Sequence, residues 1–258
     1  MTDNDNSLLT ARICDAFNSA RQRNAPSFVG FLNEMEIAFV LEHIKSSSFV
    51  AQFSKTEKYC FFGGYENAER KIFCAMPNWA EDQSDICFPI TVLHIKHNPK
   101  YELRHSDYLG SIMAQGIVRS KIGDIIVNDN GAYIFVHNDV VKYIISQIDK
   151  IGRVGVNIEI AESAEINVDS VYKDISVTIA SSRLDCIVGA LVGTSRSTAV
   201  KLIASRLVFV NSVECSDVDK RISNGDTITI RKNGKFIIDS VSGLTKKGRT
   251  VMIARKKI

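Results

Sequence analysis

The residues of this chain that are most suited to binding chemistry are the lysines and arginines of its last 78 residues. Residues 181–258 contain 15 Lys and Arg against 6 Asp and Glu, a net charge of +9, whereas the other 180 residues contain 17 against 23, a net charge of −6. A basic segment joined to a slightly acidic body is typical of a chain that binds a polyanion at one end. On charge alone, a basic face that only meets solvent is the alternative.

The first candidate phosphate contact lies at a predicted helix start. Ser195 is expected to cap a helix whose first turn holds Arg196, and the amides of a capped helix start attract phosphate. Lys201 is predicted to face solvent, opposite the apolar stripe of the same helix. Arg183 has two interpretations that stay open: it contacts the bound polyanion, or it pairs with Asp185 or another nearby acid.

A second candidate is the basic turn around Gly248, where Lys246, Lys247 and Arg249 place three cations within four residues. Such crowding is repulsive in a purely structural turn and becomes favourable against phosphates, where each contact releases counterions. A solubilising loop is the alternative.

Metal chemistry is not expected. The six cysteines form no CxxC pair, which favours small buried thiols over a zinc site or a disulfide framework. His94 and His97 are three residues apart on a predicted strand and therefore point to opposite faces.

The chain also lacks the marks of an exported or membrane protein. No apolar run reaches the roughly 18 residues that a bilayer requires. The first ten residues are acidic and polar, without the basic-then-apolar order of a signal peptide. We expect a cytoplasmic protein without a membrane partner.

The N-terminal third predicts a mixed α/β domain over residues 1–80. Asn33 and Glu36 have the spacing of a capping box at a helix start. Residues 49–53 and 59–62 are expected to pair as a hairpin, and residues 66–73 have a helical pattern that ends before Pro77.

Residues 81–180 predict a ferredoxin-like middle domain. Strands over 90–95, 124–127, 133–136 and 154–160 alternate with helices over 106–115 and 139–149, in the order strand-helix-strand-strand-helix-strand. RRM domains share this order and stack RNA bases on aromatic residues of the sheet. Tyr133 and Phe135 lie on one face of a central strand. We expect both to be buried in the core rather than to stack on RNA bases.

Residues 181–258 predict a compact α+β domain. Two short helices, the first ended by Gly193, precede strands over 208–211, 227–230, 236–241 and 250–254. The predicted fold class is therefore α+β in three domains.

The C-terminal motifs resemble the S4 RNA-binding domain over about 50 residues. They are Arg183-Leu184-Asp185, Ser195-Arg196-Ser197-Thr198-Ala199, Leu202-Ile203, Val208-Phe209-Val210-Asn211 and Gly225-Asp226. Two positions depart from the S4 pattern, which usually has glycine where this chain has Arg206 and Ser212. Arg206 either alters the turn or adds an RNA contact. The resemblances to the S4 domain and to its YlmH family extend the expected RNA-binding set to Ser197, Arg206, Asn211, Arg231, Lys232 and Lys235.

The whole chain resembles the YlmH family of bacterial S4-domain proteins. The motifs are residues 63–70, 105–113, 121–125, 150–153 and 243–249. Many relatives have an Arg-Gly-x-Gly-Arg element where this chain has Arg231-Lys232-Asn233-Gly234-Lys235, which keeps the charge and loses one glycine. The resemblance implies a ribosome-associated protein that binds rRNA of the large subunit beside peptidyl-tRNA, with tRNA as a further candidate partner, in the rescue of stalled nascent chains.

Enzymatic readings have little support in the sequence. Arg183-Leu184-Asp185 belongs to the S4 pattern rather than to a pseudouridine synthase, and Gly63-Gly64 lacks the further glycines of a methyltransferase cofactor loop. We expect a monomer without catalytic residues or cofactors. An RNA-modifying enzyme with an unrecognised catalytic domain and an adaptor linked to cell division are the alternatives.

Overall fold

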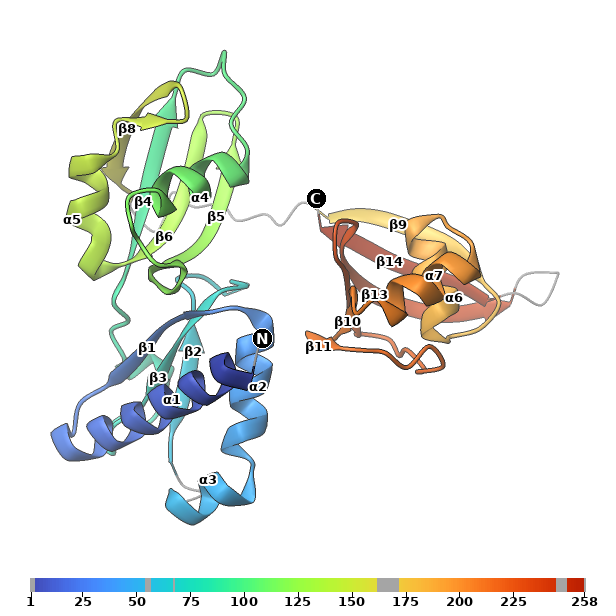
Figure 1. Cartoon of the computed structure of the whole chain (residues 1–258), viewed down its shortest axis with the longest axis horizontal. Helices are drawn as coiled ribbons and strands as arrows, with labels where there is room; N and C mark the ends of the chain where they lie inside the picture. Colours follow the sequence, from blue (N-terminus) through green and yellow to red (C-terminus); the bar gives the residue numbers. More distant parts are fainter. Residues whose placement is uncertain (1–2, 54–56, 67, 162–171, 245–249, 258) are drawn as a thin grey trace. The chain divides into compact units, whose positions relative to one another are not determined.

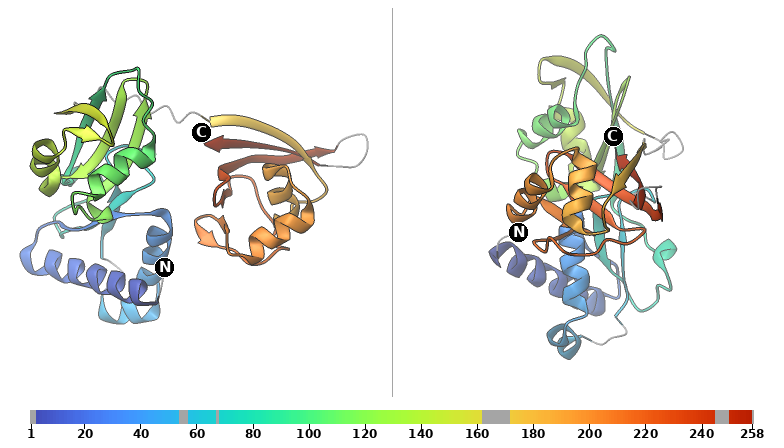
Figure 2. Two further views of the ribbon diagram at one scale, coloured as in Figure 1. Left: turned by 45° about the horizontal axis from the view of Figure 1, so that its top comes forward. Right: turned by 90° about the vertical axis from the view of Figure 1, so that its right-hand side faces the viewer.

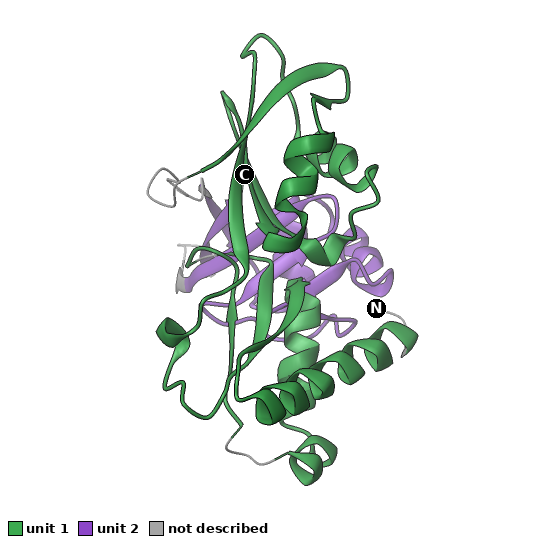
Figure 3. Ribbon diagram, turned by 90° about the vertical axis from the view of Figure 1, so that its left-hand side faces the viewer, with its two compact units in different colours: residues 1–168 green, residues 169–258 purple. Residues whose placement is uncertain are grey.

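The chain forms two compact α+β units, residues 1–168 and residues 169–258, coloured separately in Figure 3. The computed structural model describes residues 3–53, 57–66, 68–161, 172–244 and 250–257. The predicted segments 1–80 and 81–180 thus share one unit up to residue 168.

The N-terminal part packs three helices on a small sheet (Figure 1). The helices are α1 (Asp3–Arg23), α2 (Glu34–Ile44) and α3 (Ser47–Gln52). The strands are β1 (Ser27–Leu32), β2 (Tyr59–Phe62) and β3 (Lys71–Ala75), in the antiparallel order β1-β3-β2. The predicted capping box is confirmed, because Glu36 N donates to Asn33 Oδ1 at 3.0 Å and Asn33 N donates to Glu36 Oε2 at 2.7 Å.

Two predictions in this part are wrong. Residues 47–52 form helix α3 instead of a hairpin strand, since Ser46 caps the helix and the rings of Phe49 and Phe53, four residues apart, stack at 4.7 Å. The end of the predicted helix over 66–73 is strand β3. This strand is central and buried on both faces, so its continuous apolar run has no strand alternation.

The middle part of the first unit is a five-stranded antiparallel sheet with two helices on one face (Figure 1). Its strands are β4 (Ile90–His97), β5 (Ile122–Asn128), β6 (Gly131–His137), β7 (Lys150–Ile151) and β8 (Val154–Ile160), in the order β5-β6-β4-β8-β7. The helices are α4 (His105–Met113) and α5 (Asn138–Gln147), with short 3-10 turns η1 (Gln83–Asp85) and η2 (Arg119–Lys121). Each predicted element of this part is present, and Asn128 and Gly131 close the predicted β5–β6 hairpin.

A polar joint holds the N-terminal sheet against the middle sheet. Asp124 accepts hydrogen bonds from Tyr65 Oη at 2.7 Å and from the backbone amides of Glu69 and Arg70 at 2.7 and 3.0 Å. The Arg70 guanidinium donates to the carbonyl of Phe31 at 2.8 Å, so it ties β1 to the same point. The motif segments 63–70 and 121–125 therefore have a structural role in joining these two sheets.

The second unit is a six-stranded sheet with α6 (Leu184–Val192) and α7 (Arg196–Ala204) on one face (Figures 1 and 2). Its strands are β9 (Tyr172–Ile179), β10 (Val208–Val210), β11 (Val213–Glu214), β12 (Thr227–Ile230), β13 (Gly234–Leu244) and β14 (Thr250–Lys257). Their order is β11-β10-β12-β13-β14-β9. Gly193 ends α6 in the left-handed conformation, at φ 67°, as predicted.

The position of β9 differs from the predicted domain boundary at residue 181. This strand pairs with β14 along its whole length, from Tyr172 opposite Lys257 to Ile179 opposite Thr250. Ile175, Val177 and Ile179 pack into the core under α6 and α7. The C-terminal unit consequently begins before β9, and a cut at residue 181 removes an edge strand from its sheet.

In the ranges that the structure describes, no single helix has the length and apolar composition of a membrane span. The α6–α7 pair, bent by 109°, meets that test only when both helices are taken together.

Candidate nucleic-acid interface

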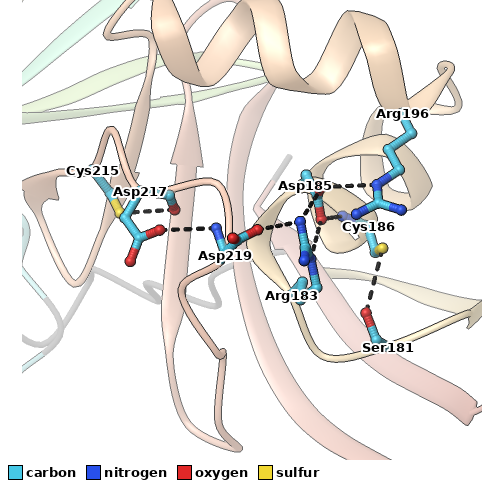
Figure 4. Close-up of polar contacts among 8 residues, drawn as sticks. All are labelled: Ser181, Arg183, Asp185, Cys186, Arg196, Cys215, Asp217 and Asp219. Carbon is cyan, nitrogen blue, oxygen red and sulfur yellow. Dashed lines mark hydrogen bonds and ion pairs between the residues drawn. The ribbon is translucent and has the colours of Figure 1, made fainter.

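A buried carboxylate organises the predicted arginines at the start of both helices (Figure 4). Asp185, which is only 1% exposed, accepts hydrogen bonds from Arg183 Nη2 at 3.1 Å and from Arg196 Nε at 2.8 Å. Arg183 also forms an ion pair with Asp219. The side chains of residues 183, 185 and 196 thus form one cluster, which we call the helix-start cluster.

The ionisation of Asp185 is set by two opposing effects. Burial raises the pKa of its carboxyl, but hydrogen bonds from Arg183, Arg196 and Cys186 outweigh burial and lower the pKa to about 2. Asp185 is therefore an anion at neutral pH, and it fixes both guanidinium groups next to the helix starts.

The two arginines differ in how many acids they contact and in how much of each side chain remains exposed to a ligand. Arg183 contacts two acids, which supports the pairing interpretation of the sequence. Arg196 is bound to Asp185 through Nε, and 59% of its side chain remains exposed. Of the two, Arg196 is the better placed for an anion in solution.

Helix α7 has the predicted cap and an exposed basic side. Ser195 Oγ accepts from the amide of Thr198 at 3.2 Å and lies 2.9 Å from the hydroxyl of Ser197. Lys201 is exposed on the last turn of the helix, and its exposure agrees with the prediction. This arrangement presents a cation and a polar helix start on one small helix.

Arg206 and Ser212, the two departures from the S4 pattern, keep the backbone conformation that glycine favours. Arg206 has a φ of 58° and Ser212 a φ of 67°. Asn211, with φ 50°, and Ser212 give the β10–β11 turn two consecutive positive φ values, as a type I′ hairpin requires. The turn at Arg206 is therefore retained, and the side chain of Arg206 reaches Glu214 at 3.4 Å while staying 76% exposed.

Asn211 has contacts inside the domain at both ends of its side-chain amide. Its Nδ2 donates to Asp226 Oδ1 at 2.8 Å, and its Oδ1 accepts from the amide of Thr227 at 2.9 Å. These bonds fix the β10–β12 junction, so the structure gives Asn211 a structural role.

The predicted cations of the β12–β13 turn belong to a larger group, which we call the sheet-end cluster. Arg231 lies over the ring of Phe209 at 5.2 Å, and Lys232 in the turn has a φ of 70°. The register brings further cations from β13, β14 and β9 to the same end of the sheet. The cluster comprises Arg231, Lys232, Lys235, Lys256 and Lys173.

Lys173 and Lys256 were not among the residues predicted from sequence. They are direct cross-strand partners on β9 and β14, and Lys256 lies 5.6 Å from the centre of the Phe236 ring. Two like charges placed opposite each other destabilise a sheet unless an anion joins them. Only the pairing of β9 with β14 reveals this feature, because 82 residues separate the two lysines in the sequence.

The predicted basic turn of Lys246, Lys247 and Arg249 lies outside the described residues. Its flanking residues, Leu244 and Thr250, close the end of the β13–β14 hairpin opposite to Gly234 and Lys256. Strand β13 has eleven residues, so the two described ends of this hairpin lie roughly 30 Å apart.

The part of the chain that the structure describes contains no group of three or more His, Cys, Asp or Glu side chains placed to hold a metal ion. The candidate surface is therefore defined by cations, by helix starts and by one organising carboxylate.

Comparisons with known proteins agree with a nucleic-acid-binding class. Residues 83–165 match the protein family described as "Putative RNA-binding domain in YlmH". "Ribosome-associated protein quality control protein P2" of Bacillus subtilis (strain 168) is 28% identical over 192 residues, which are 73% of this chain and 74% of the relative. The resemblance to the YlmH family predicted from the sequence motifs is confirmed.

Among solved structures, "Cell division protein ylmH from Streptococcus pneumoniae" aligns with a TM-score of 0.49 and 22% sequence identity. The alignment covers 64% of this chain and 95% of that chain.

The matched family segment is not the basic one. Residues 83–165 contain 8 Lys and Arg against 10 Asp and Glu, a net charge of −2. The unit of residues 169–258 contains 16 against 8, a net charge of +8. The middle part therefore lacks the net positive charge with which the C-terminal unit can attract phosphates.

Proposed function

We propose that this protein is a non-enzymatic RNA-binding factor of the bacterial ribosome. It binds structured rRNA of the large subunit, near peptidyl-tRNA, and acts in the handling of stalled nascent chains. The observation that carries the proposal is the concentration of a net charge of +8 in one compact unit of a chain whose relative is named for ribosome-associated quality control.

The geometry of the C-terminal unit supports its assignment as an S4 domain. The positions where the S4 pattern has glycine show φ values of 58° and 67° here, although the residues are Arg206 and Ser212. A non-glycine residue with positive φ is uncommon, so two such residues at these places indicate that the backbone of the pattern is retained. The helix pair α6–α7 followed by the β10–β12 strands agrees with the same assignment.

The strand order of the middle part supports a ferredoxin-like assignment. In the spatial order β5-β6-β4-β8, the two central strands are β4 and β6, which are the first and third of these strands along the chain. All neighbouring strands are antiparallel, which agrees with the ferredoxin-like arrangement.

We assign the phosphate contacts to two described groups of side chains. The first comprises Arg196 and Lys201 on α7, with Ser195 and Ser197 at the helix start. The second comprises Arg206 and the sheet-end cluster. Lys246, Lys247 and Arg249, which lie outside the described residues, are assigned a third contact from the sequence alone, whereas Arg183 and Asn211 hold the structure in place.

Sucrose-gradient sedimentation of the tagged protein from a bacterial lysate at low salt tests the proposal. Co-migration with the large subunit is expected, together with release by a Lys201→Gln, Arg231→Gln, Lys232→Gln variant. A matched variant, Lys142→Gln with Lys150→Gln, removes exposed lysines of the first unit and should stay bound. Wild-type protein that remains at the top of the gradient would contradict the proposal.

The absence of catalysis is tested separately. Mass spectrometry of nucleosides in rRNA and tRNA should give the same set of modifications in deletion and wild-type cells. A modification missing from the deletion strain would favour the RNA-modifying alternative.

A further inference from the structure

The face of the middle sheet away from α4 and α5 is divided into a covered half and an open half. Val92 and Phe135 pack against Phe31 and Ile72 of the N-terminal sheet, so the first row of this face is buried. The expected burial of Phe135 is confirmed, whereas Tyr133, two residues earlier on β6, is only half-buried. Tyr133 and its cross-strand partner Ile126 on β5 are themselves partly buried against this cluster, so the cover ends within the next row.

The two rows beyond the covered one bring together side chains from four neighbouring strands. The register places Tyr133 opposite His94 and His94 opposite Glu159, while Lys96 lies opposite Gly131 and Asn157. We call this set the sheet platform, and it comprises His94, Lys96, Asn128, Tyr133, Asn157 and Glu159.

The centre of the sheet platform is an aromatic pair. The rings of His94 and Tyr133 are stacked with their centres 4.2 Å apart and an angle of 25° between their planes. His94 is 8% exposed, so it supports Tyr133 from within the sheet, while part of Tyr133 meets solvent. A supported and partly exposed ring is the kind of surface on which a nucleic-acid base stacks.

Gly131, two residues before Tyr133, is buried where β6 closely approaches the backbone of β4. A Cβ atom at Gly131 would lie 2.0 Å from the carbonyl oxygen of Ile95, so no larger residue fits the backbone there. Gly131 separates Asn128 on β5 from Lys96 on β4. The side chains of Asn128 and Asn157 are exposed in this row, and Asn128 Oδ1 accepts from the amide of Asn130 at 2.9 Å. Side-chain amides of this kind can form hydrogen bonds with base edges.

The charge of this region disfavours a phosphate ligand. Lys96 forms an ion pair with Glu159, and this contact holds the pKa of the Glu159 carboxyl below its usual range. A charged carboxylate beside the ring repels a phosphate, and residues 83–161 contain 8 Lys and Arg against 8 Asp and Glu, so this part has no net positive charge. A base, which is neutral and has a π face, meets no such penalty.

We propose that the sheet platform binds an unpaired RNA base, stacked on Tyr133 and contacted at its edge by the amides of Asn128 and Asn157. This inference rests on the proposed function as an RNA-binding protein, and it adds a single-strand contact of different chemistry from the phosphate contacts of the C-terminal unit. The N-terminal sheet leaves room for a short single-stranded segment rather than a long one, because it covers the first row of the face.

The test uses the full chain and a uridine 12-mer with one central 2-aminopurine, whose fluorescence falls when the base stacks on an aromatic ring. Wild-type protein and Tyr133→Phe should quench the probe, while Tyr133→Leu should lose the quenching and bind about tenfold more weakly, because the stacking of one base is removed. Tyr143→Leu, which removes an exposed tyrosine from α5, is the matched control and should behave as wild type.

A duplex RNA of the same length separates the inference from the proposed function. Wild type and Tyr133→Leu should bind the duplex equally, through the C-terminal cations. If wild-type protein binds neither RNA, the proposed function fails. If it binds both but Tyr133→Leu quenches the probe as wild type does, the platform assignment alone is overturned.

Photocrosslinking of wild-type protein to RNA that carries 5-iodouridine needs no variant, so it remains informative if Tyr133→Leu fails to fold. Mass spectrometry should find crosslinked peptides that contain Tyr133 or His94. Crosslinks confined to residues 172–257 would overturn the assignment.

Discussion

The middle sheet and the C-terminal sheet have the same two-layer architecture, but the segments that contain them have net charges of opposite sign. Both are antiparallel, and both are covered on one face by two helices whose apolar side chains form the core. Residues 83–165 have a net charge of −2 and an aromatic pair on the open face, whereas residues 169–258 have a net charge of +8 with cations at the sheet end and on α7. The shared architecture therefore does not determine the surface chemistry of either sheet, which is set by the residues on the exposed surfaces.

The two sheets also differ in how their polar groups are organised. In the C-terminal unit a buried anion, Asp185, holds Arg183 and Arg196 at the helix starts. In the first unit the corresponding polar centre, Asp124, accepts from Tyr65 and from backbone amides and joins two sheets. One carboxylate thus positions a candidate binding arginine, and the other fixes the fold.

The largest expected effect concerns the boundary between the two regions. A fragment of residues 169–258 should fold, whereas a fragment of residues 181–258 should be largely unfolded, because it lacks β9 and exposes the core around Ile175, Val177 and Ile179. Burial of three such side chains contributes on the order of 5 kcal/mol, which is comparable with the whole stability of a small domain. Circular dichroism with urea titration of both fragments measures this difference, and equal midpoints would show that β9 is dispensable.

The next effect concerns the positive charge of the sheet-end cluster. Replacement of Arg231, Lys232 and Lys235 by Gln should weaken duplex RNA binding on the order of 100-fold at 50 mM salt and reduce the logarithmic salt slope by about 2 to 3. The melting temperature should change little, since these side chains lie outside the core. Filter binding across a salt series gives the slope, and an unchanged slope would exclude this cluster from the RNA contact.

A smaller effect concerns the helix-start cluster. Because the folded-state pKa of Asp185 is lowered to about 2, its charge stabilises the fold above its ordinary pKa, and this contribution is lost as pH falls toward the folded value. Asp185→Asn should cost about 2 kcal/mol at pH 7, and the difference from wild type should shrink between about pH 4 and pH 2.

Urea denaturation of the 169–258 fragment at pH 7 and pH 2.5 measures the effect of Asp185. Glu214→Gln, which removes an exposed partner of Arg206, is the matched control and should cost less than about 1 kcal/mol at either pH. A difference between wild type and Asp185→Asn that is the same at both pH values would contradict the electrostatic assignment.

The smallest effect concerns the lysine pair that only the structure reveals. Lys173→Gln with Lys256→Gln should leave stability unchanged or slightly raised, because the two like charges oppose each other across β9 and β14. RNA affinity should fall about tenfold at low salt, with a salt slope reduced by about 1 to 2. A gain in stability without any loss of affinity would show that the pair only meets solvent.

The elements that carry local signals could be predicted from sequence. Asn33 and Glu36 indicate the start of a helix, Gly193 indicates the end of a helix, and Ser195 indicates the N-cap of α7. Each of these signals depends on residues only a few positions apart. The middle domain could be predicted for the same reason, since apolar periodicity alternates cleanly between strands and helices.

The failures came from non-local pairing and from ambiguous short runs. Residues 49–53 are too short and too apolar for their periodicity to separate a strand from a helix. The place of β9 depends on strand β14, which lies more than 70 residues later, and no local pattern specifies that partner. The same long-range pairing explains why Arg196 could be anticipated and Lys173 could not.

The central claim is that the two regions bind RNA through different chemistry, and a salt series on the two separate units tests it most directly. Fragments of residues 1–168 and 169–258 are titrated with the same single-stranded 12-mer from 50 to 300 mM KCl. The basic unit should give a steep logarithmic slope, about −0.7 for each phosphate contact, and the first unit should bind weakly with a slope near zero. Equal slopes, or a steeper slope for residues 1–168, would contradict the division of phosphate and base contacts between the two sheets.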